Sequence, residues 1–384
     1  MKNLKEKKDM AIMKEGEGKI VLFYPYISKE SIIEVNDTLR SRWLGQGPKV
    51  EKFEAQFSKK FSSNLPSIAV GSGTDALHLA YILADLKPGD EVIVPVFTCT
   101  ATNIPFLYMG VKIVFADIQR DTLNIDPGHV KALINDKTKA IICVHYGGLP
   151  CDMKELQDIA DSKGIPVIED AAHALGGTYM GKSIGSISDF TIFSFQAIKH
   201  LTTGDGGMLV VKNQNLTAKG KRVRWFGIDR EAKQGGIWEN DIIEIGYKYQ
   251  MTDISAAIGL GALVNFDQTL KFRKKLFKLY EDGLDNISGL KFVGGGYTDR
   301  EHAAWLCTVI VDRRHDLQVK LRENEIESNQ VHFRNDRYSV FKGSANNCYP
   351  NMDSLENNYL VLPLHPKMTE YNVEKICSVI KSGW

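Results

Sequence analysis

Short apolar runs alternate with amphipathic segments through the first part of the chain. Residues 49–61, KVEKFEAQFSKKF, place Val50, Phe53, Phe57 and Phe61 on one face of a predicted helix. Strand-like runs follow at SIAV (67–70), EVIVPVF (91–97), KIVFADI (112–118), KAIICVHY (139–146), PVIEDAA (166–172), FTIFSF (190–195) and GMLVV (207–211). Continuous apolar strands between helical segments are typical of a parallel sheet that is covered on both faces. The pattern therefore predicts an α/β fold with a mainly parallel, seven-stranded sheet flanked by helices.

The pattern changes near residue 265. A long helical region begins near Thr252, and the strands LKFVGG (290–295), WLCTVIVD (305–312) and LVLPL (360–364) then stand between helices. This arrangement predicts a smaller α+β domain at the C terminus. We expect a flexible N-terminal extension over residues 1–20, a large domain over 21–265 and a small C-terminal domain over 266–384.

Composition and charge narrow the possible partners. Lys and Arg total 48 and Asp and Glu total 47 in 384 residues, so the formal net charge is +1 at pH 7. This balance gives no electrostatic reason to expect nucleic acid or a membrane surface as a partner. No apolar run approaches the roughly 18 residues of a membrane span, and the charged start lacks a secretory core, so we expect a cytoplasmic protein. The six cysteines include no CxxC pair, and no metal site is predicted.

A glycine-rich turn, GSGT at 71–74, connects the first predicted strand to a helix. Such a turn lets the backbone approach a ligand, and the first amides of the helix form an anion site to which the Thr74 hydroxyl adds a hydrogen bond. The turn matches neither of the two common nucleotide fingerprints. On its own, a purely structural turn is an equal alternative.

Adjacent carboxylates end the strand in VIEDAAH (167–173). Glu169 and Asp170 point to opposite faces of a strand, so one of them faces the sheet interior or a site. A buried carboxylate is costly unless it is paired, and a protonated ring nitrogen would be a suitable partner. The alternative is an Asp that caps the next turn.

One lysine stands between a buried strand and a glycine-rich tail in SFQAIKHLTTGDGG (194–207). Enclosure by apolar structure lowers the proton affinity of an amine, which makes Lys199 a usable nucleophile for an aldehyde. An anion cradle, a strand-end acid and a Ser194–Lys199 pair match the phosphate, ring nitrogen and aldehyde of pyridoxal 5'-phosphate. In this interpretation GSGT and Ser194 hold the phosphate and Asp170 keeps the ring nitrogen protonated.

The order and spacing of these segments resemble the DegT/StrS-type pyridoxal-phosphate sugar aminotransferases, which have the aspartate-aminotransferase fold (fold type I). The resemblance runs from about Tyr24 to the C terminus. Its landmarks are RWLGQGPKVEKFE (42–54), GSGTDALHLA (71–80), EVIVPVFTCTATN (91–103), LNIDP (123–127), VHYGGLPCDM (144–153), VIEDAAHALGG (167–177), DFTIFSFQAIKHLTTGDGGML (189–209), GYKYQMTDISAAIGL (246–260) and LVLPLHPKMTE (360–370).

The resemblance implies roles for individual residues. Lys199 matches the lysine that forms the Schiff base with the cofactor, Asp170 the acid at the pyridine nitrogen, and Ser194, Gly73 and Thr74 the phosphate-binding positions. It also implies a homodimer with shared active sites, in which the GYKYQM segment reaches the phosphate of the neighbouring subunit.

The chain departs from the family pattern near the cofactor. His173 replaces the usual Gln near the ring and its phenolic oxygen, which makes a contact there sensitive to pH. Cys99 replaces the aromatic residue that stacks on the ring. Lys248 stands for the usual Asn and Gln250 for the usual Arg; Lys248 could pair with the phosphate, or face solvent.

The resemblance implies a transamination that runs through pyridoxamine 5'-phosphate. We expect glutamate as the donor and a keto group of a nucleoside-diphosphate-linked keto-deoxy sugar as the acceptor, C4 being favoured and C3 possible, in amino-sugar or surface-polysaccharide biosynthesis. The alternatives are transamination of a cyclitol or another non-nucleotide ketone, and a non-catalytic pyridoxal-phosphate-binding regulatory protein. Candidate substrate contacts are His145, Trp225 and the HFRND run (332–336), in which Arg334 is expected to meet a diphosphate or a donor carboxylate.

Overall fold

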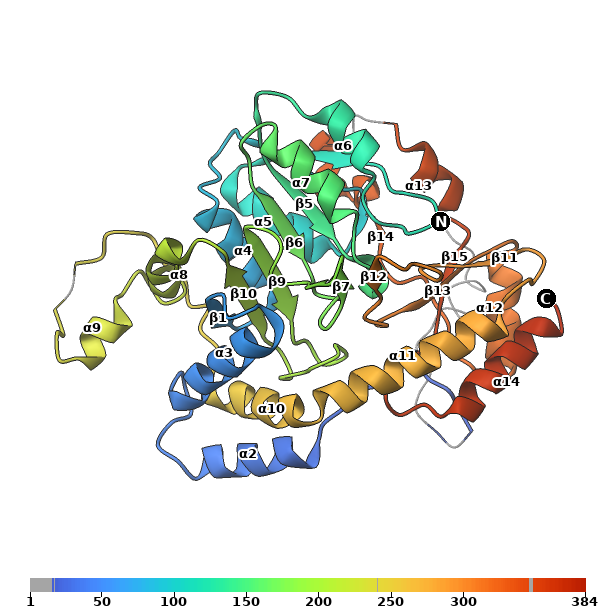
Figure 1. Cartoon of the computed structure of the whole chain (residues 1–384), viewed down its shortest axis with the longest axis horizontal. Coiled ribbons are helices and arrows are strands. Elements are labelled where there is room, and N and C mark those ends of the chain that lie inside the picture. The colour runs from blue at the N-terminus through green and yellow to red at the C-terminus, as the bar shows by residue number, and fades with distance from the viewer. Residues whose placement is uncertain (1–15, 17, 240, 345–347) are drawn as a thin grey trace.

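A seven-stranded sheet forms the centre of the computed structural model, which describes residues 16, 18–239, 241–344 and 348–384 (Figure 1). The strand order is β1-β10-β9-β6-β5-β2-β4, and within this sheet only β10 runs antiparallel to its neighbours. The predicted mainly parallel α/β fold is therefore confirmed. The strands are β1 (Ser67–Val70), β2 (Glu91–Pro95), β4 (Lys112–Ala116), β5 (Thr138–Val144), β6 (Val167–Asp170), β9 (Phe190–Ser194) and β10 (Gly207–Val211).

Helices cover both faces of this sheet, because successive strand residues point to opposite sides and both sides are apolar. In β1, Ile68 and Val70 pack into one buried cluster with α4 and α5, whereas Ala69 packs into a second cluster with α3, α7 and α10. The helices of this region are α2 (Lys29–Leu39), α3 (Pro48–Phe61), α4 (Gly73–Leu83), α5 (Thr100–Met109), α6 (Pro127–Leu133), α7 (Met153–Asp161), α8 (Thr217–Val223), α9 (Arg230–Gln234) and α10 (Asp253–Val264).

Helix α11 (Phe266–Gly283) leads from the large sheet to the C-terminal region, where a three-stranded sheet has the order β11-β13-β15 (Figure 1). Its apolar side chains form a third buried cluster with α11, α12 and α14. The elements here are β11 (Leu290–Phe292), β12 (Arg300–Glu301), β13 (Cys307–Val311), α12 (Arg314–Glu323), β14 (Phe333–Arg334), α13 (Pro350–Leu355), β15 (Tyr359–Leu362) and α14 (Glu370–Lys381).

Two short pairings tie distant parts of the chain together. Strand β14 of the C-terminal region pairs with β3 (Phe97–Thr98), and β12 pairs with β7 (Thr178–Tyr179), which pairs in turn with β8 (Lys182–Ser183). The predicted domain boundary near residue 265 falls between α10 and α11 and stays a prediction. The predicted N-terminal extension lies mostly outside the described residues, although its last residue, Ile20, is buried and bridges to Ile326.

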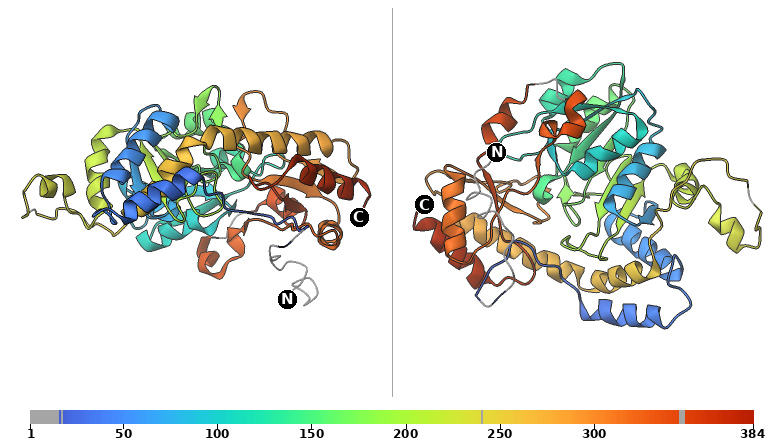
Figure 2. Two further views of the ribbon diagram at one scale, coloured as in Figure 1. Left: turned by 90° about the horizontal axis from the view of Figure 1, so that it is seen from below. Right: turned by 180° about the vertical axis from the view of Figure 1, so that it is seen from behind.

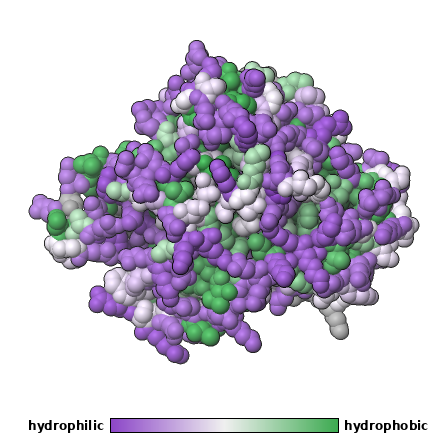
Figure 3. Space-filling view, viewed as in Figure 1, coloured by the Kyte–Doolittle hydropathy of each residue, from purple (hydrophilic) through white to green (hydrophobic). Residues whose placement is uncertain are grey.

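A projecting arm consists of residues 226–239 and 241–248. It includes α9 and extends away from the sheet (Figures 1 and 2). The space-filling view shows hydrophobic side chains at this left-hand end and over α2 and α10 at the bottom (Figure 3). Among the described residues, no helix combines the length and apolar character that crossing a bilayer requires.

Candidate active site

A cavity of about 310 Å³ opens where the parallel strands end. Val144, Asp170 and Ser194 are the last residues of β5, β6 and β9, and all three line it. Open α/β sheets bind ligands at this edge. The cavity brings together the sequence-predicted residues Gly73, Thr74, Cys99, Asp170, His173, Ser194 and Lys199.

The N terminus of α4 forms one end of the cavity. Ser72 caps the helix, because its hydroxyl accepts a hydrogen bond from the backbone N–H of Asp75. A Cβ at position 73 would lie 2.9 Å from the Cβ of Ser194, so only glycine lets the helix begin this close to β9. Backbone N–H groups without helical partners and the helix dipole favour an anion here. Gly73, Thr74 and Ser194 can therefore cradle a phosphate.

The carboxylate of Asp170, at the end of β6, also lines this cavity. Asp170 is 4% exposed; the Thr102 hydroxyl donates to Oδ2 at 2.8 Å and the backbone N–H of Ala172 donates to Oδ1 at 3.1 Å. Burial raises the pKa of Asp170, and these two hydrogen bonds together with the charge of Lys199 oppose the rise. A buried carboxylate of this kind is stabilised by a cationic N–H group that binds next to it.

Lys199 enters the cavity from the loop that follows β9. Desolvation lowers the pKa of its amine to about 8, although Cys99 and Asp170 raise it. The Nζ atom lies 3.7 Å from the centre of the Trp305 ring. Trp305 also donates from Nε1 to the carbonyl oxygen of Ile198 at 3.1 Å, so it fixes the backbone next to the lysine. An enclosed amine that loses its proton near neutral pH can attack a carbonyl carbon.

Flat side chains stack along one side of the cavity. The His173 ring lies 3.8 Å from the Trp305 ring at an interplanar angle of 17°, and 5.2 Å from the His332 ring at 5°. The Nε2 atoms of the two histidines are 3.3 Å apart. Within the described part of the chain, the Nδ1 atom of His173 is buried and has no hydrogen-bond partner. This nitrogen is therefore available to a molecule in the cavity.

Glu169 points to the opposite face of the sheet from Asp170, as the alternation of strand side chains requires. Its carboxylate contacts His145 Nε2 at 2.9 Å and accepts hydrogen bonds from the Ser188 backbone and the Thr191 hydroxyl. His145, predicted as a substrate contact, is thus fully buried and does not line the cavity. The alternation of strand side chains alone did not say which of the two carboxylates faces the site, and the resemblance to the family selected Asp170.

Beside His145 lie two thiols. The potential ligand atoms of Cys143, His145 and Cys151 are all within 4.8 Å of one another. However, His145 accepts the backbone N–H of Cys151 at Nδ1 and contacts Glu169 at Nε2, so hydrogen bonds already engage both of its nitrogens. This arrangement explains the cluster as a hydrogen-bonded support beneath the end of β5.

Arg334, predicted to meet a diphosphate or a carboxylate ligand, is 4% exposed and does not line the cavity. Its guanidinium donates to Asp336 at 2.7 and 2.8 Å, and also contacts Asp353 and Glu356. These carboxylates satisfy its charge within the chain. Because Asp336 stands two residues away in the same HFRND run, the sequence already contained a signal for this internal pair.

Trp225 and Lys248 also lie outside this cavity. The two residues form an isolated β-bridge with each other. The Trp225 ring lies 5.2 Å from the guanidinium carbon of Arg230, and Lys248 Nζ lies 5.4 Å from the Phe226 ring. Both residues therefore belong to the arm and its base.

Phe23, Trp305 and Val331 were not selected from the sequence, and His332 was included only as the first residue of the HFRND run. Trp305 lies between the short strand β12 and β13, and Phe23 packs on it at 5.8 Å. Val331 and His332 line the cavity just before β14. An aromatic residue next to a strand gave no local sign of a site, and only the return of the C-terminal region over the sheet edge brings these rings to Lys199.

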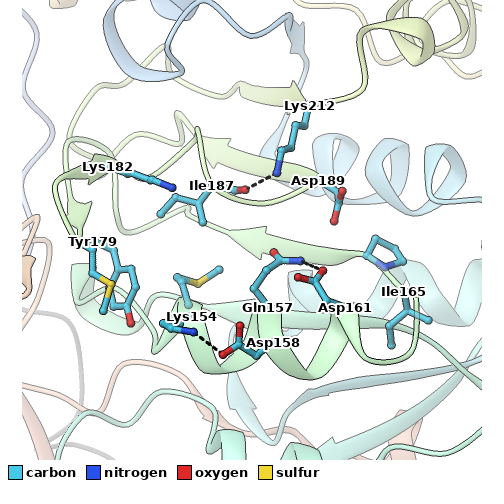
Figure 4. Close-up of a pocket in the computed structure, with 14 residues that line it drawn as sticks. Lys154, Gln157, Asp158, Asp161, Ile165, Tyr179, Lys182, Ile187, Asp189 and Lys212 are labelled. Atoms are coloured by element: carbon cyan, nitrogen blue, oxygen red, sulfur yellow. Dashed lines mark hydrogen bonds and ion pairs between the residues drawn. The ribbon is translucent and has the colours of Figure 1, made fainter.

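A larger cavity, of about 770 Å³, lies on the outer surface between α7 and β8 (Figure 4). Two pairs of its polar side chains bind each other: Lys154 pairs with Asp158, and Gln157 donates to Asp161. We place the active site in the smaller cavity because that cavity joins the strand ends, a helix N terminus and the desolvated Lys199.

The fold and the cavity together define an α/β protein with a desolvated lysine amine at the carboxyl edge of its sheet. The chain belongs to the DegT/DnrJ/EryC1/StrS aminotransferase family, whose sequence model matches residues 25–381. It is therefore an aminotransferase, an enzyme of the transferase class.

Two curated relatives and one solved structure illustrate the family. The chain is 36% identical over 373 residues to the spore coat polysaccharide biosynthesis protein SpsC of Bacillus subtilis, covering 93% of this chain and 95% of the relative. It is 32% identical over 375 residues to the UDP-4-amino-4-deoxy-L-arabinose–oxoglutarate aminotransferase of Shewanella sediminis, covering 93% and 96%. The PMP-form of the sugar aminotransferase Spr1654 from Streptococcus pneumoniae superimposes with a TM-score of 0.89 at 31% identity, covering 94% and 98%.

Proposed function

We propose that the protein is a cytoplasmic, homodimeric sugar aminotransferase with pyridoxal 5'-phosphate as its cofactor. It takes the amino group of glutamate and transfers it to the C4 keto group of a nucleoside-diphosphate-linked keto-deoxy sugar. The name of the Shewanella relative supports this choice, since it pairs a UDP-linked 4-amino sugar with oxoglutarate, the keto acid that remains when glutamate loses its amino group. SpsC supports a role in polysaccharide biosynthesis.

The single observation that carries the proposal is that Lys199, Asp170 and the N terminus of α4 line one cavity. These three parts fit a molecule that has an aldehyde, a basic ring nitrogen and a phosphate. Glycine at position 73 lets the N terminus of α4 begin close to Ser194, so that helix amides and a serine hydroxyl can both bind one phosphate, and the unpartnered Nδ1 of His173 can donate to a ring oxygen. The residues present therefore fit pyridoxal phosphate, and Spr1654 has both PLP-form and PMP-form structures.

When bound, pyridoxal phosphate supplies an aldehyde and a ring that accepts electrons. The protein supplies positions and protons. The Lys199 amine, which desolvation keeps partly unprotonated, accepts and returns the proton at the substrate carbon that exchanges its amino group. The Asp170 carboxylate holds a proton at the ring nitrogen, and Gly73, Thr74 and Ser194 fix the phosphate.

The arm supports the homodimer in this proposal. Its exposed apolar side chains are Ile237 (58%), Trp238 (75%), Ile242 (54%), Ile243 (71%) and Ile245 (81%). Apolar side chains gathered on a projecting segment are a mark of an interaction site. A second copy of the chain is the partner that also gives Lys248 a role, because that amine cannot serve its own cavity.

Charges placed on the arm should separate the subunits. We expect I243D/I245D to sediment as a monomer at concentrations where the wild-type protein sediments as a dimer, because two buried charges at an interface are strongly unfavourable. Tyr371→Asp, at an exposed aromatic residue of α14, is the matched control and should stay dimeric. If the I243D/I245D protein stays dimeric, the arm is not part of the dimer interface.

The absorbance spectrum of the purified, cofactor-loaded protein tests the function. We expect a band near roughly 400–430 nm that shifts toward about 330 nm when glutamate is added, as the cofactor gains an amino group. A panel of nucleotide-linked 4-keto and 3-keto sugars and of inosose-type ketones should then reverse the shift only with a nucleotide sugar. A band that glutamate leaves unchanged would contradict the proposal and favour a regulatory protein, and reversal by an inosose would favour a cyclitol substrate.

A further inference from the structure

His332 stands at the rim of the cavity in an unusual but fixed conformation. Its φ is +65°, in the left-handed region, which histidine visits more readily than most residues do. Its carbonyl oxygen accepts a hydrogen bond of 2.7 Å from the Tyr359 hydroxyl. Its ring lies nearly parallel to that of His173, and the two Nε2 atoms are 3.3 Å apart. The backbone therefore holds the His332 ring against one nitrogen of His173.

The two histidines share a single proton at this contact. Burial lowers the pKa of His173 well below its usual range, and burial together with Lys199 lowers the pKa of His332 to about 3. Besides His332, the groups around His173 include Lys199, His200 and His145, and a positive charge on any of them also disfavours a charged His173; the centre of the Tyr146 ring lies 6.5 Å from that of the His173 ring. Both imidazoles are neutral, and a neutral imidazole has one N–H donor and one acceptor nitrogen. Across the Nε2–Nε2 contact, one ring donates and the other accepts.

The direction of this hydrogen bond decides what His173 offers to the cavity. If His332 donates from Nε2, the Nε2 of His173 accepts and its Nδ1 must carry a proton. If His173 donates instead, its buried Nδ1 has only a lone pair. The ring oxygen next to the aldehyde of pyridoxal phosphate carries negative charge and needs a donor. A cofactor whose aldehyde reaches Lys199 would bring that oxygen close to the stack, because Trp305 contacts both Lys199 and His173.

We propose that His332 is a positioning residue that fixes His173 in the tautomer that donates from Nδ1 to the phenolic oxygen of the cofactor. This inference rests on the proposed function. His332 has intermediate exposure, so water can satisfy its own Nδ1 while Nε2 donates. An amide side chain such as Gln always has an N–H group to donate. His173 donates from Nδ1 in only one tautomer, and His332 selects that tautomer.

The test compares replacements that end at different distances from the backbone. Asn tolerates the left-handed conformation of residue 332, but its amide ends near the position of Nδ1 and falls short of His173. The Gln amide extends to about the position of Nε2 and can donate an N–H. H332N therefore removes the N–H group that donates to His173, and H332Q restores it. H173F removes the group that would donate to the phenolic oxygen of the cofactor.

One readout is the absorbance of the lysine-bound cofactor as a function of pH. A donor at the phenolic oxygen stabilises the deprotonated form, so its loss raises the pKa of the lysine-bound cofactor. We expect the midpoint in H332N and H173F to move upward by roughly half to one pH unit, the size of one hydrogen bond. The H332Q midpoint should stay near the wild-type value, and H173F/H332N should move no further than H173F. An unchanged midpoint in H332N, or additive shifts in the double variant, would overturn the inference.

A second readout needs no cofactor. In apoprotein labelled with ¹⁵N at histidine, the His173 signals are assigned by their loss in H173F, and they report which ring nitrogen carries the proton. We expect the proton on Nδ1 in the wild-type protein and a mixture in H332N. A proton on Nε2 of wild-type His173 would overturn the inference even where the absorbance band and its response to glutamate uphold the proposed function. Absence of any band from the wild-type protein would instead overturn the proposed function, and the inference with it.

Discussion

Two walls of the cavity are built in different ways. The sheet wall, formed by Gly73, Asp170, Ser194 and Lys199, follows the ends of neighbouring strands, and the backbone fixes its geometry. The stack wall is formed by Phe23, His173, Trp305 and His332. Its rings come from three separate parts of the chain: the N-terminal segment, the loop after β6 and the C-terminal region.

The walls also differ in charge. The sheet wall holds an amine and a carboxylate, whereas burial keeps the two imidazoles of the stack wall neutral. The difference suggests a division of work, in which the sheet wall carries the reaction and the stack wall sets the position and proton affinity of the groups that react. Substitutions on the first wall should then remove activity, and substitutions on the second should tune it.

The largest effect should come from Lys199. We expect Lys199→Arg to lower the rate of amino transfer by roughly 10²–10⁴-fold, because its guanidinium stays protonated and cannot relay a proton near neutral pH. Lys212→Arg, at the rim of the outer cavity, is the matched control and should keep full activity. Turnover is measured with glutamate and a keto-sugar acceptor. Full activity of the Lys199→Arg enzyme would show that Lys199, and with it the sheet wall, does not carry the reaction.

Asp170 should show opposite effects on binding and on stability. Asp170→Asn should weaken binding of pyridoxal phosphate by roughly ten- to a hundredfold, since a hydrogen bond to a charged group contributes about 1.5–3 kcal/mol. Equilibrium dialysis measures this loss, with the exposed Asp158→Asn as control.

The stability of the apoprotein follows from the raised pKa of Asp170. The folded state binds the proton more tightly than the unfolded state does, so this group makes stability fall as the pH rises from the unfolded pKa through the folded one. At pH 7 the Asn variant lacks that penalty, and its apoprotein should melt about 1–3 °C higher. A lower melting temperature for the variant apoprotein would show that Asp170 is stabilised without a cationic partner.

These sheet-wall residues could be predicted from the sequence because each lies in a short motif at a strand end. Lys199, Asp170 and Ser194 reach the same edge as a direct consequence of parallel topology. Of the stack wall, His173 was predicted because it follows Asp170 in the same motif. Trp305 could not be predicted, since it is more than one hundred residues from Lys199 and meets it only through tertiary packing. His145 and Arg334 were predicted from residue type alone, and their buried carboxylate partners Glu169 and Asp336 keep both away from the cavity.

A smaller effect is expected on the stack wall at Trp305. The amine must be unprotonated to capture the cofactor aldehyde, so the rate of capture by the apoprotein should rise with pH through about 8. A tryptophan face favours the ammonium, and a phenyl ring does so less strongly. In Trp305→Phe the midpoint should therefore fall by up to about half a pH unit, while Trp384→Phe should not change it. An upward shift would mean that the ring acts on the amine chiefly by excluding water.

Reductive trapping tests the central claim most directly, because it records which amine holds the cofactor. The protein loaded with pyridoxal phosphate is treated with borohydride, digested and sequenced by mass spectrometry. We expect the phosphopyridoxyl group on Lys199, in a peptide that is unlabelled when Asp170→Asn protein is treated at a cofactor concentration that saturates only the wild-type site. A label on any other lysine, or no label on wild-type protein that shows the absorbance band, would contradict the account.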